Sequence, residues 1–507
     1  MMKGPMSADL VRIDLKPLGE TLEVERGAPL RDVLFAYGVE FPCGGRGRCK
    51  RCRIRVLEGM LEPAAADREL LSEGELAAGW RLACHARATG PLALEIAQMD
   101  AAILADESSF EFTPREGLGI AVDLGTTTLV AQLLDLATAH VLAVRTALNP
   151  QIAYGADIMS RVEYALCGGR DKLEDLIRAG IGELVKELHS AARVDSRPIT
   201  RIAMVGNTVM HHLFCGFDVE PLSHVPFESP RDGLAAFEAA GLGWTLPGNP
   251  RVSFLPCLGG FVGSDILAGL VAARMQEGSG LTCLLDLGTN GEILLGTRER
   301  MVCASAAAGP AFEGGRISMG MRAATGAISE VSAVNGGFEC SVLGHVEARG
   351  ICGSGLVDAI AVGLDLGRVL PSGRLANGGR PLALSGEVAL TQADIRQLQL
   401  AKGAVAAGIR IVLKRLGASP DEVGKVYLAG AFGNYVSRAG ARRIGLIDFP
   451  DGKIEQAGNT ALLGAKLALF RDDLDFADIR RRVEHISLAS DPEFQEIYVE
   501  EMGFPSY

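Results

Sequence analysis

Two stretches of the sequence follow one pattern, and this repeat constrains the fold more than any other feature. Residues 118–136 and residues 281–297 each read as an apolar strand, the tetrapeptide Asp-Leu-Gly-Thr and a second apolar strand. Each copy places a carboxylate at the end of its first strand, Asp123 in one and Asp286 in the other. The separation far exceeds the period of a solenoid repeat, so the pattern predicts an internal duplication.

The turn in each copy has the chemistry of a phosphate site. Glycine lets the backbone approach a ligand closely, and N–H groups and hydroxyls can then bind phosphate oxygens. A carboxylate would repel phosphate but can hold Mg²⁺. The P-loop signature is absent, and a strand rather than a helix follows each turn. We therefore expect two facing phosphate turns with Asp123 and Asp286 beside Mg²⁺; the turn residues are Gly125, Thr126, Thr127, Gly288, Thr289 and Asn290.

Three further glycine turns fit the same picture. A helix N-terminus reached through glycine is a good seat for an anion. Each turn is weak evidence alone, and their order along the chain is more informative. The residues are Gly206 and Asn207, then Gly353, Ser354 and Gly355 at an expected helix start, then Gly430 and Ala431 after an expected strand. Asp265 lies between the two halves, where it either supports water or Mg²⁺ or serves as a helix N-cap.

Four cysteines form a second constellation near the start of the chain. Cys43, Cys49 and Cys52 have the spacing C-x5-C-x2-C in a glycine-rich basic loop, and Cys84 follows later. Four thiolates of this kind suit a [2Fe–2S] cluster. Zinc is the main alternative, although zinc ribbons usually have two CxxC knuckles, and a disulfide pair is a weaker one. The context predicts two strands in residues 10–26, a helix from Leu30, and strands after Cys52 and Cys84; it resembles plant-type and adrenodoxin-type ferredoxins.

Composition excludes several classes of protein. The chain of 507 residues is 48% hydrophobic and 22% charged, which is typical of α/β proteins. Its net charge of −12 argues against a nucleic-acid partner. No uncharged apolar run reaches about 18 residues, so no membrane span is expected. The first residues show no signal peptide, and we expect a cytoplasmic protein.

The motifs divide the chain into four parts. We expect an iron–sulfur domain at residues 1–98, a linker at 99–116, a first ATPase lobe at 117–265 and a second lobe with a C-terminal extension at 266–507. The expected fold class is a multidomain combination of α/β and α+β. The linker mixes acidic residues, serines and a proline, which is typical of a connector.

The order of the glycine turns resembles the superfamily of acetate and sugar kinases, Hsp70 and actin. "VDLGTTT" matches its first phosphate loop, "LDLGTNGE" its second and "LAGAFG" its adenosine loop. The whole chain resembles the ATP-dependent reductive activators of corrinoid proteins, most specifically in "GNTVMHHLFCG", "GNTALLGAKLAL" and "ISLASDPEFQEIYVEEMGFP". The resemblance implies an N-terminal β-grasp [2Fe–2S] ferredoxin domain followed by a duplicated two-lobed ATPase. Some members carry a further middle domain, which only the short linker replaces here.

The resemblance also implies a function. One electron passes from the cluster, held by the four cysteines, to Co(II) of a corrinoid-binding methyltransferase protein, which becomes Co(I). ATP and Mg²⁺ are the other cofactors, with Asp123, Asp286 and Asp265 as catalytic carboxylates and with Gly353, Ser354, Gly430 and Ala431 near the nucleoside. The expected partners are the corrinoid protein, an external low-potential electron donor and, as one option, a second copy of the chain.

Three other functions compete with this interpretation. An activator of a radical dehydratase or reductase also couples ATP to iron–sulfur reduction, but its cluster is typically held within the ATP-binding unit. A small-molecule kinase with a structural metal domain would transfer phosphate whether or not a cluster is present. A redox sensor that gates a nucleotide switch would turn over slowly and reduce no corrinoid.

Overall fold

The protein forms two compact units. The structure, a computed structural model, describes residues 9–16, 20–34, 39, 52–96, 110–155, 157–192, 194, 197–288, 290–324, 326–433 and 435–506. The first unit comprises residues 1–100 together with residues 150–161, and the second comprises residues 101–149 and 162–507. Helix α4 (Ile158–Tyr164) spans one of the junctions between them.

A five-stranded sheet forms the first unit, in the order β2-β1-β5-β3-β4. Its strands are β1 (Leu10–Lys16), β2 (Glu20–Glu25), β3 (Arg53–Glu58), β4 (Trp80–Leu82) and β5 (Leu92–Glu95). β1 and β5 are parallel, whereas the β1–β2, β3–β5 and β3–β4 pairs are antiparallel. Alternation along β1 buries Val11, Ile13 and Leu15 on one face, which is the pattern that predicted this strand.

Three short helices accompany this sheet: α1 (Leu30–Leu34), α2 (Ala65–Leu70) and α3 (Glu73–Ala77). The predicted strands in residues 10–26, after Cys52 and after Cys84 are confirmed, as is the start of α1 at Leu30. The sequence analysis did not anticipate α2, α3 or β4. α3 begins with a capping box in which Ser72 and Glu75 bind each other's backbone N–H groups.

The second unit contains two six-stranded sheets. The first has the order β10-β11-β9-β6-β7-β8. Its strands are β6 (Leu118–Leu124), β7 (Thr128–Asp135), β8 (Val141–Leu148), β9 (Ile199–Gly206), β10 (Ala235–Glu238) and β11 (Arg251–Phe254). β6, β7 and β8 form an antiparallel meander, and β9 and β11 continue the sheet parallel to β6.

The second sheet repeats this arrangement, in the order β21-β20-β12-β13-β14-β22. Its strands are β12 (Thr282–Leu287), β13 (Gly291–Gly296), β14 (Met301–Ala306), β20 (Lys425–Ala429), β21 (Ile454–Gly458) and β22 (Val483–His485). β12, β13 and β14 again form a meander, and β20 and β21 again continue it in parallel with its first strand. The two Asp-Leu-Gly-Thr motifs thus occupy equivalent places in the two sheets.

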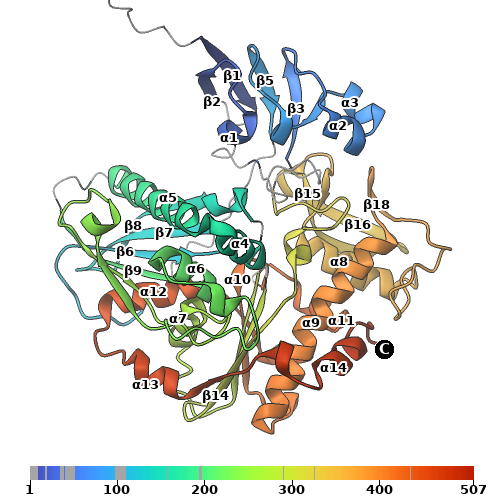
Figure 1. Ribbon diagram of the computed structural model, residues 1–507. Coiled ribbons are helices and arrows are strands. Elements are labelled where there is room, and N and C mark those ends of the chain that lie inside the picture. The colour runs from blue at the N-terminus through green and yellow to red at the C-terminus, as the bar shows by residue number, and fades with distance from the viewer. Residues whose placement is uncertain are drawn as a thin grey trace, which may run out of the picture. The chain divides into compact units, whose positions relative to one another are not determined.

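Helices separate and cover the two sheets (Figure 1). α7 (Ser264–Ala272) and α12 (Thr460–Phe470) pack on each other between them, with α12 against β6 and β9 and α7 against β9, β12 and β13. α5 (Arg170–Ala191) contacts β7, β8 and α6 (Thr208–Cys215), while α9 (Gln392–Leu416) packs on β13 and β14. α12 therefore packs on the first six-stranded sheet, although it comes late in the chain. Gly464 permits this packing, since a Cβ there would meet the Ala268 carbonyl.

Smaller elements complete the second unit. β15 (Ala327–Val334), β16 (Gly337–Val342) and β17 (Gly350–Ile351) form a small sheet against α8 (Gly353–Asp365), beside the hairpin of β18 (Leu382–Ser385) and β19 (Val388–Leu390). The remaining helices are α10 (Gly430–Gly433), α11 (Arg438–Arg443), α13 (Phe476–Arg481) and α14 (Phe494–Glu501), of which α14 packs on α9. The described end of the expected linker is packed: Phe110 and Phe112 contact the ring of Phe470 edge-on.

Candidate functional site

The first phosphate turn is tightly built. The Gly125 N–H donates to the Thr128 carbonyl, which closes the turn between β6 and β7. A Cβ at Gly125 would lie 2.6 Å from that carbonyl oxygen, so only glycine fits. The Asn207 amide donates to the Thr126 hydroxyl over 2.8 Å and holds the turn from outside. Thr126 is nearly buried, and the turn is pre-formed rather than loose.

The second turn lies at the same place in the second sheet. Asp286 is the next-to-last residue of β12 and lies beside Ala429 of the parallel strand β20. Gly430, which follows Ala429, has a φ of 81° and starts α10. A Cβ at Gly430 would collide with the Asp286 carboxylate. Glycine is required at this position for both reasons. The Gly288 N–H donates to the Asn290 carbonyl, whereas Thr289 lies outside the described residues.

Carboxylates from both halves of the second unit face one another. Burial raises the pKa of Asp123 to about 6, and burial together with the charge of Asp123 raises the pKa of Asp286 to about 7. Burial and then the Asp265 and Asp286 charges raise the pKa of Glu292 well above its ordinary value. Within the described ranges, no lysine or arginine forms an ion pair with Asp123, Asp265, Asp286 or Glu292. Largely desolvated acids without a basic partner suit a bound divalent cation.

The third aspartate, Asp265, belongs to this group. It lies in the first turn of α7, whose N-cap is Gly263, so Asp265 is not the N-cap. Burial and then the charge of Asp286 raise its pKa, with a smaller contribution from Asp123. Its position beside both aspartates favours the first of the two interpretations, a role toward water or Mg²⁺.

Two asparagines hold the first phosphate turn and the strand end before it, each through a hydrogen bond from its side-chain amide. Asn207 caps α6 by accepting from the Met210 N–H, and its amide donates to Thr126. Asn459 caps α12 by accepting from the Leu462 N–H, and its amide donates to the Asp123 carboxylate over 3.0 Å. The sequence analysis missed Asn459. Its signal was present, because Gly-Asn-Thr occurs at 206–208 and again at 458–460.

The glycines at the start of α8 have a packing role. A Cβ at Gly353 would collide with the Phe312 carbonyl, and one at Gly355 with the Ile328 carbonyl. The Ser354 hydroxyl donates to the Ser329 carbonyl over 2.8 Å. These contacts explain the residue types at 353–355 without a ligand, and a role for them at a nucleoside stays a prediction. Phe312 also stacks on Phe432 of α10, with 4.5 Å between ring centroids.

A hollow of about 540 Å³ lies beside α8 and the segment that follows α10. Its wall includes Asp358, Ser437, Arg438 and Gln456. Burial raises the pKa of Asp358 to about 6, while the carboxylate accepts from the Val331 N–H. The wall of this hollow thus offers both hydrogen-bond donors and acceptors, and the predicted adenosine turn at Gly430 and Ala431 does not contribute to it.

Two of the four predicted cluster ligands come together in the first unit. Cys52 precedes β3 and Cys84 follows β4, and the antiparallel pairing of Arg53 with Leu82 brings these strand ends side by side. The Ala83 N–H donates to the Cys52 carbonyl over 2.9 Å. Cys43 and Cys49 lie outside the described residues. The two described cysteines, Cys52 and Cys84, therefore lie where a thiolate-ligated centre would need them.

The cysteines of the second unit are of a different kind. Burial raises the pKa of Cys215 to about 12 and raises the pKa values of Cys257, Cys283 and Cys303 further still. Such thiols are inert small hydrophobic groups.

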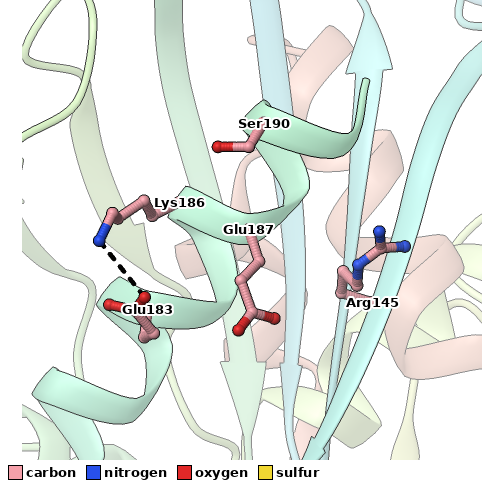
Figure 2. A pocket seen from close by; sticks show the side chains of 5 residues that line it. All are labelled: Arg145, Glu183, Lys186, Glu187 and Ser190. Carbon is pink, nitrogen blue, oxygen red and sulfur yellow. Dashed lines mark hydrogen bonds and ion pairs between the residues drawn. The ribbon is translucent and has the colours of Figure 1, made fainter. Parts of the chain in front are cut away.

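A further hollow, of about 560 Å³, lies on the outer face of α5 and β8 and is shown in Figure 2. Exposed side chains line it, and Lys186 pairs with Glu183 from the preceding turn of the helix. None of the predicted site residues contributes to it. We do not regard it as the functional site.

Two properties of the described residues bear on cofactors and membranes. No three His, Cys, Asp or Glu side chains among them are arranged to hold a metal ion on their own. Mg²⁺ needs no such set, because it usually takes one or two carboxylates together with waters and substrate phosphates. None of the described helices is both long and apolar enough to span a bilayer.

Family models match most of the chain. The family model for a 2Fe-2S iron-sulfur cluster binding domain matches residues 13–89. The model for the RACo middle region matches residues 118–278, and that for the C-terminal domain of RACo, the ASKHA domain, matches residues 280–507. The RACo middle region thus coincides with most of the predicted first lobe, and the expected absence of a further domain between the iron–sulfur domain and that lobe stays a prediction.

Known proteins also match over most of the chain. The corrinoid activation enzyme RamQ of Eubacterium limosum is 30% identical, over 96% of this chain and 98% of its own. A [Co(II) methylated amine-specific corrinoid protein] reductase of Methanosarcina barkeri is 28% identical, over 76% and 77%. A solved structure of a reductive activator for corrinoid, iron–sulfur protein superposes with a TM-score of 0.70, at 25% identity and over 98% of each chain. The chain belongs to the RACo family, the ATP-dependent reductive activators of corrinoid proteins.

Proposed function

We propose that this protein reduces the cobalt of a corrinoid-binding methyltransferase protein from Co(II) to Co(I), one electron per event, with ATP as the driving nucleotide. The observation that carries this proposal is the presence in one chain of a paired cysteine site and a separate site of buried carboxylates and phosphate turns. When bound, a [2Fe–2S] cluster supplies single electrons at low potential, near −400 mV in plant-type ferredoxins. Cys43, Cys49, Cys52 and Cys84 would hold it.

The chain's own residues prepare the nucleotide site. The N–H groups and hydroxyls of the two turns would bind phosphate oxygens, while Asp123 and Asp286 would hold Mg²⁺ and Asp265 would support a water beside them. Asn459 keeps the Asp123 carboxylate oriented and lowers its pKa against the effect of burial. The hollow beside Asp358 takes the nucleoside, with that carboxylate available to accept from ribose hydroxyls.

The fold supports a role for nucleotide closure. The equivalent strand order of the two six-stranded sheets supports an internal duplication, and the order β2-β1-β5-β3-β4 of the five-stranded sheet supports a β-grasp fold for the first unit. We place the domain limits at residues 98, 116 and 265, with the expected linker packed from Phe110 onward. ATP favours the partner-active arrangement only through a higher affinity for it than for the alternative. An external low-potential donor reloads the first unit, in the cytoplasm.

The competing activator of a dehydratase or reductase is less well supported. Such a protein holds its cluster within the ATP-binding unit, and the buried thiols described there have raised pKa values that oppose ligation. A kinase with a structural metal domain would not need Cys52 for its reaction.

The deciding experiment mixes the anaerobically purified protein with a candidate corrinoid protein and a reductant. Co(I) absorbance should develop only when Mg²⁺ and ATP are both present. Asp286→Ala should abolish it while leaving the visible spectrum of the cluster unchanged. Full activation by that variant, or full-speed reduction without nucleotide, would refute the proposal.

A further inference from the structure

Asn149, the residue after β8, contacts the first phosphate turn at two points. Its side-chain amide donates to the Gly125 carbonyl over 2.9 Å, and its backbone N–H donates to the Thr127 carbonyl over 2.9 Å. The same amide also donates to the sulfur of Met210 over 3.5 Å, and Asn149 is fully buried. All of these contacts lie within the second compact unit. One buried residue thus holds the backbone on both sides of Thr126.

These two bonds fix the direction of the neighbouring N–H groups. A trans peptide group is planar, so its carbonyl and its N–H point in opposite directions. Because the Gly125 carbonyl is bonded to Asn149, the Thr126 N–H points away from Asn149. The Thr127 carbonyl and the Thr128 N–H are arranged in the same way. The N–H groups of the turn therefore lie on the side opposite Asn149.

The peptide group between Gly125 and Thr126 needs this support because of the glycine. Glycine lacks a Cβ, so a peptide group beside it can adopt orientations that other residues resist. A stiffer residue cannot replace Gly125, since a Cβ there would lie 2.6 Å from the Thr128 carbonyl oxygen. An inverted peptide would place a carbonyl oxygen, which repels anions, where the N–H had been. Donors that are already in position avoid the cost of reorganisation when a charged ligand arrives.

The second sheet shows that the repeated fold does not require this contact. The first residues of β7 and β13 pair with the last residues of β8 and β14. Asn149 directly follows β8, and Ala307 directly follows β14. Ala307 therefore takes the place of Asn149 in the second sheet, and its methyl group cannot donate a hydrogen bond. This difference between the halves favours a role for Asn149 toward the ligand of the first turn.

We propose that Asn149 is a positioning residue for the nucleotide phosphates. By holding the Gly125 carbonyl, it keeps the Thr126 N–H directed toward the side of the turn on which phosphate would bind. This inference rests on the proposed function of the turn 125–127 as a phosphate site. Asn149 touches no nucleotide itself and acts only through the turn.

The test measures the affinity of the full-length holoprotein for Mg–ATP by calorimetric titration and its stability by urea unfolding without nucleotide. Asn149→Ala removes both bonds of the side-chain amide. A buried carbonyl then loses its donor and the turn can adopt other orientations, so we expect the affinity for Mg–ATP to fall about tenfold or more. A variant that is less stable but binds Mg–ATP as tightly as the wild type would overturn the inference, because Asn149 would then serve the fold alone.

Asn149→Asp keeps the shape of the side chain and serves as a second measure where the alanine variant folds poorly. A protonated carboxyl group can donate to the Gly125 carbonyl, whereas an ionised one cannot. The affinity of this variant for Mg–ATP, divided by that of the wild type at the same pH, should therefore rise about threefold or more from pH 8 to pH 5.5. The corresponding ratio for Asn149→Ala should stay constant. Ratios close to one in both variants would overturn the inference.

Met210→Leu is the matched control. It removes only the sulfur that accepts from the same amide, and it keeps a side chain of similar size. This variant should bind Mg–ATP within about twofold of the wild type, because the bond to Gly125 remains. A loss as large as that of Asn149→Ala would overturn the inference, since the effect would then arise from packing against α6. A wild type that binds no Mg–ATP would instead refute the proposed function.

Discussion

Gly430 offers a sharp test of how the second phosphate turn is built. The substitution is Gly430→Ala, which adds one methyl group where φ is 81° and where that group collides with the Asp286 carboxylate. Two costs combine. A non-glycine residue in the left-handed region costs about 1–2 kcal/mol, and overpacking costs a further ~1–3 kcal/mol. We expect a loss of about 2–5 kcal/mol in the free energy of unfolding, together with a displaced Asp286.

Gly417 separates the two costs. It ends α9 with φ of 67°, and a Cβ there would meet nothing within 4 Å. Gly417→Ala should therefore cost only the backbone term of about 1–2 kcal/mol and leave the nucleotide site intact. The difference between the two variants isolates the collisions of the added methyl group with the Asp286 carboxylate and the Leu287 backbone.

The assay is urea unfolding of the full-length protein with and without Mg–ATP. A ligand that binds only the folded state stabilises it by RT ln(1 + [L]/Kd), so the gain from nucleotide reports its affinity. Gly417→Ala should keep the full gain, and Gly430→Ala should lose most of it. Equal losses of stability in the two variants, with equal gains from Mg–ATP, would refute the reasoning.

Three other predictions follow from the same geometry. Cys52→Ser should remove the visible absorbance of the cluster and the bound iron but leave Mg–ATP binding within about twofold, because the site lies in the other unit; titration and iron analysis check this. Asn459→Ala removes the donor that lowers the pKa of Asp123, so the pH midpoint of metal-dependent nucleotide binding should move to higher pH. Calorimetric titrations from pH 5.5 to 8 check this, and an unmoved pH midpoint would contradict it. In metal-free protein, burial raises the folded-state pKa of Asp286 to about 7, above its ordinary 3.8. The contribution of Asp286 to stability is therefore complete below about pH 4 and is lost as the pH rises through 7. Asp286→Asn should gain stability over the wild type toward pH 8, by at most about 4 kcal/mol, and Mg–ATP should abolish that advantage.

Much of the fold could be read from local patterns. The alternation of apolar residues predicts β1, and the Asp-Leu-Gly-Thr copies predict the hairpins β6–β7 and β12–β13, because strand periodicity and turn chemistry are properties of short segments. α2, α3 and β4 were missed because their residues show no strong periodicity.

The site was predictable only in part, for a similar reason. Asp123 and Asp286 were found because each ends a strand within a recognisable motif. Asn459 and Glu292 were not, since their importance depends on contacts that folding creates: Glu292 lies opposite Asp286 across β12 and β13, and Asn459 reaches Asp123 from the far end of the chain. The glycines at 353 and 355 illustrate the opposite case, in which a motif is explained by close packing.

The late position of α12 has a consequence for biosynthesis. Its side chains Ala461, Leu462, Ala465 and Leu469 form one core with Ala121, Val130 and Ala203 of the first sheet. While the chain is emerging from the ribosome, that face of the sheet stays uncovered until synthesis has passed Phe470. Domains made early usually fold early, but the predicted first lobe cannot complete its core before α12 has been made. A chain truncated before α12 would therefore be prone to aggregation.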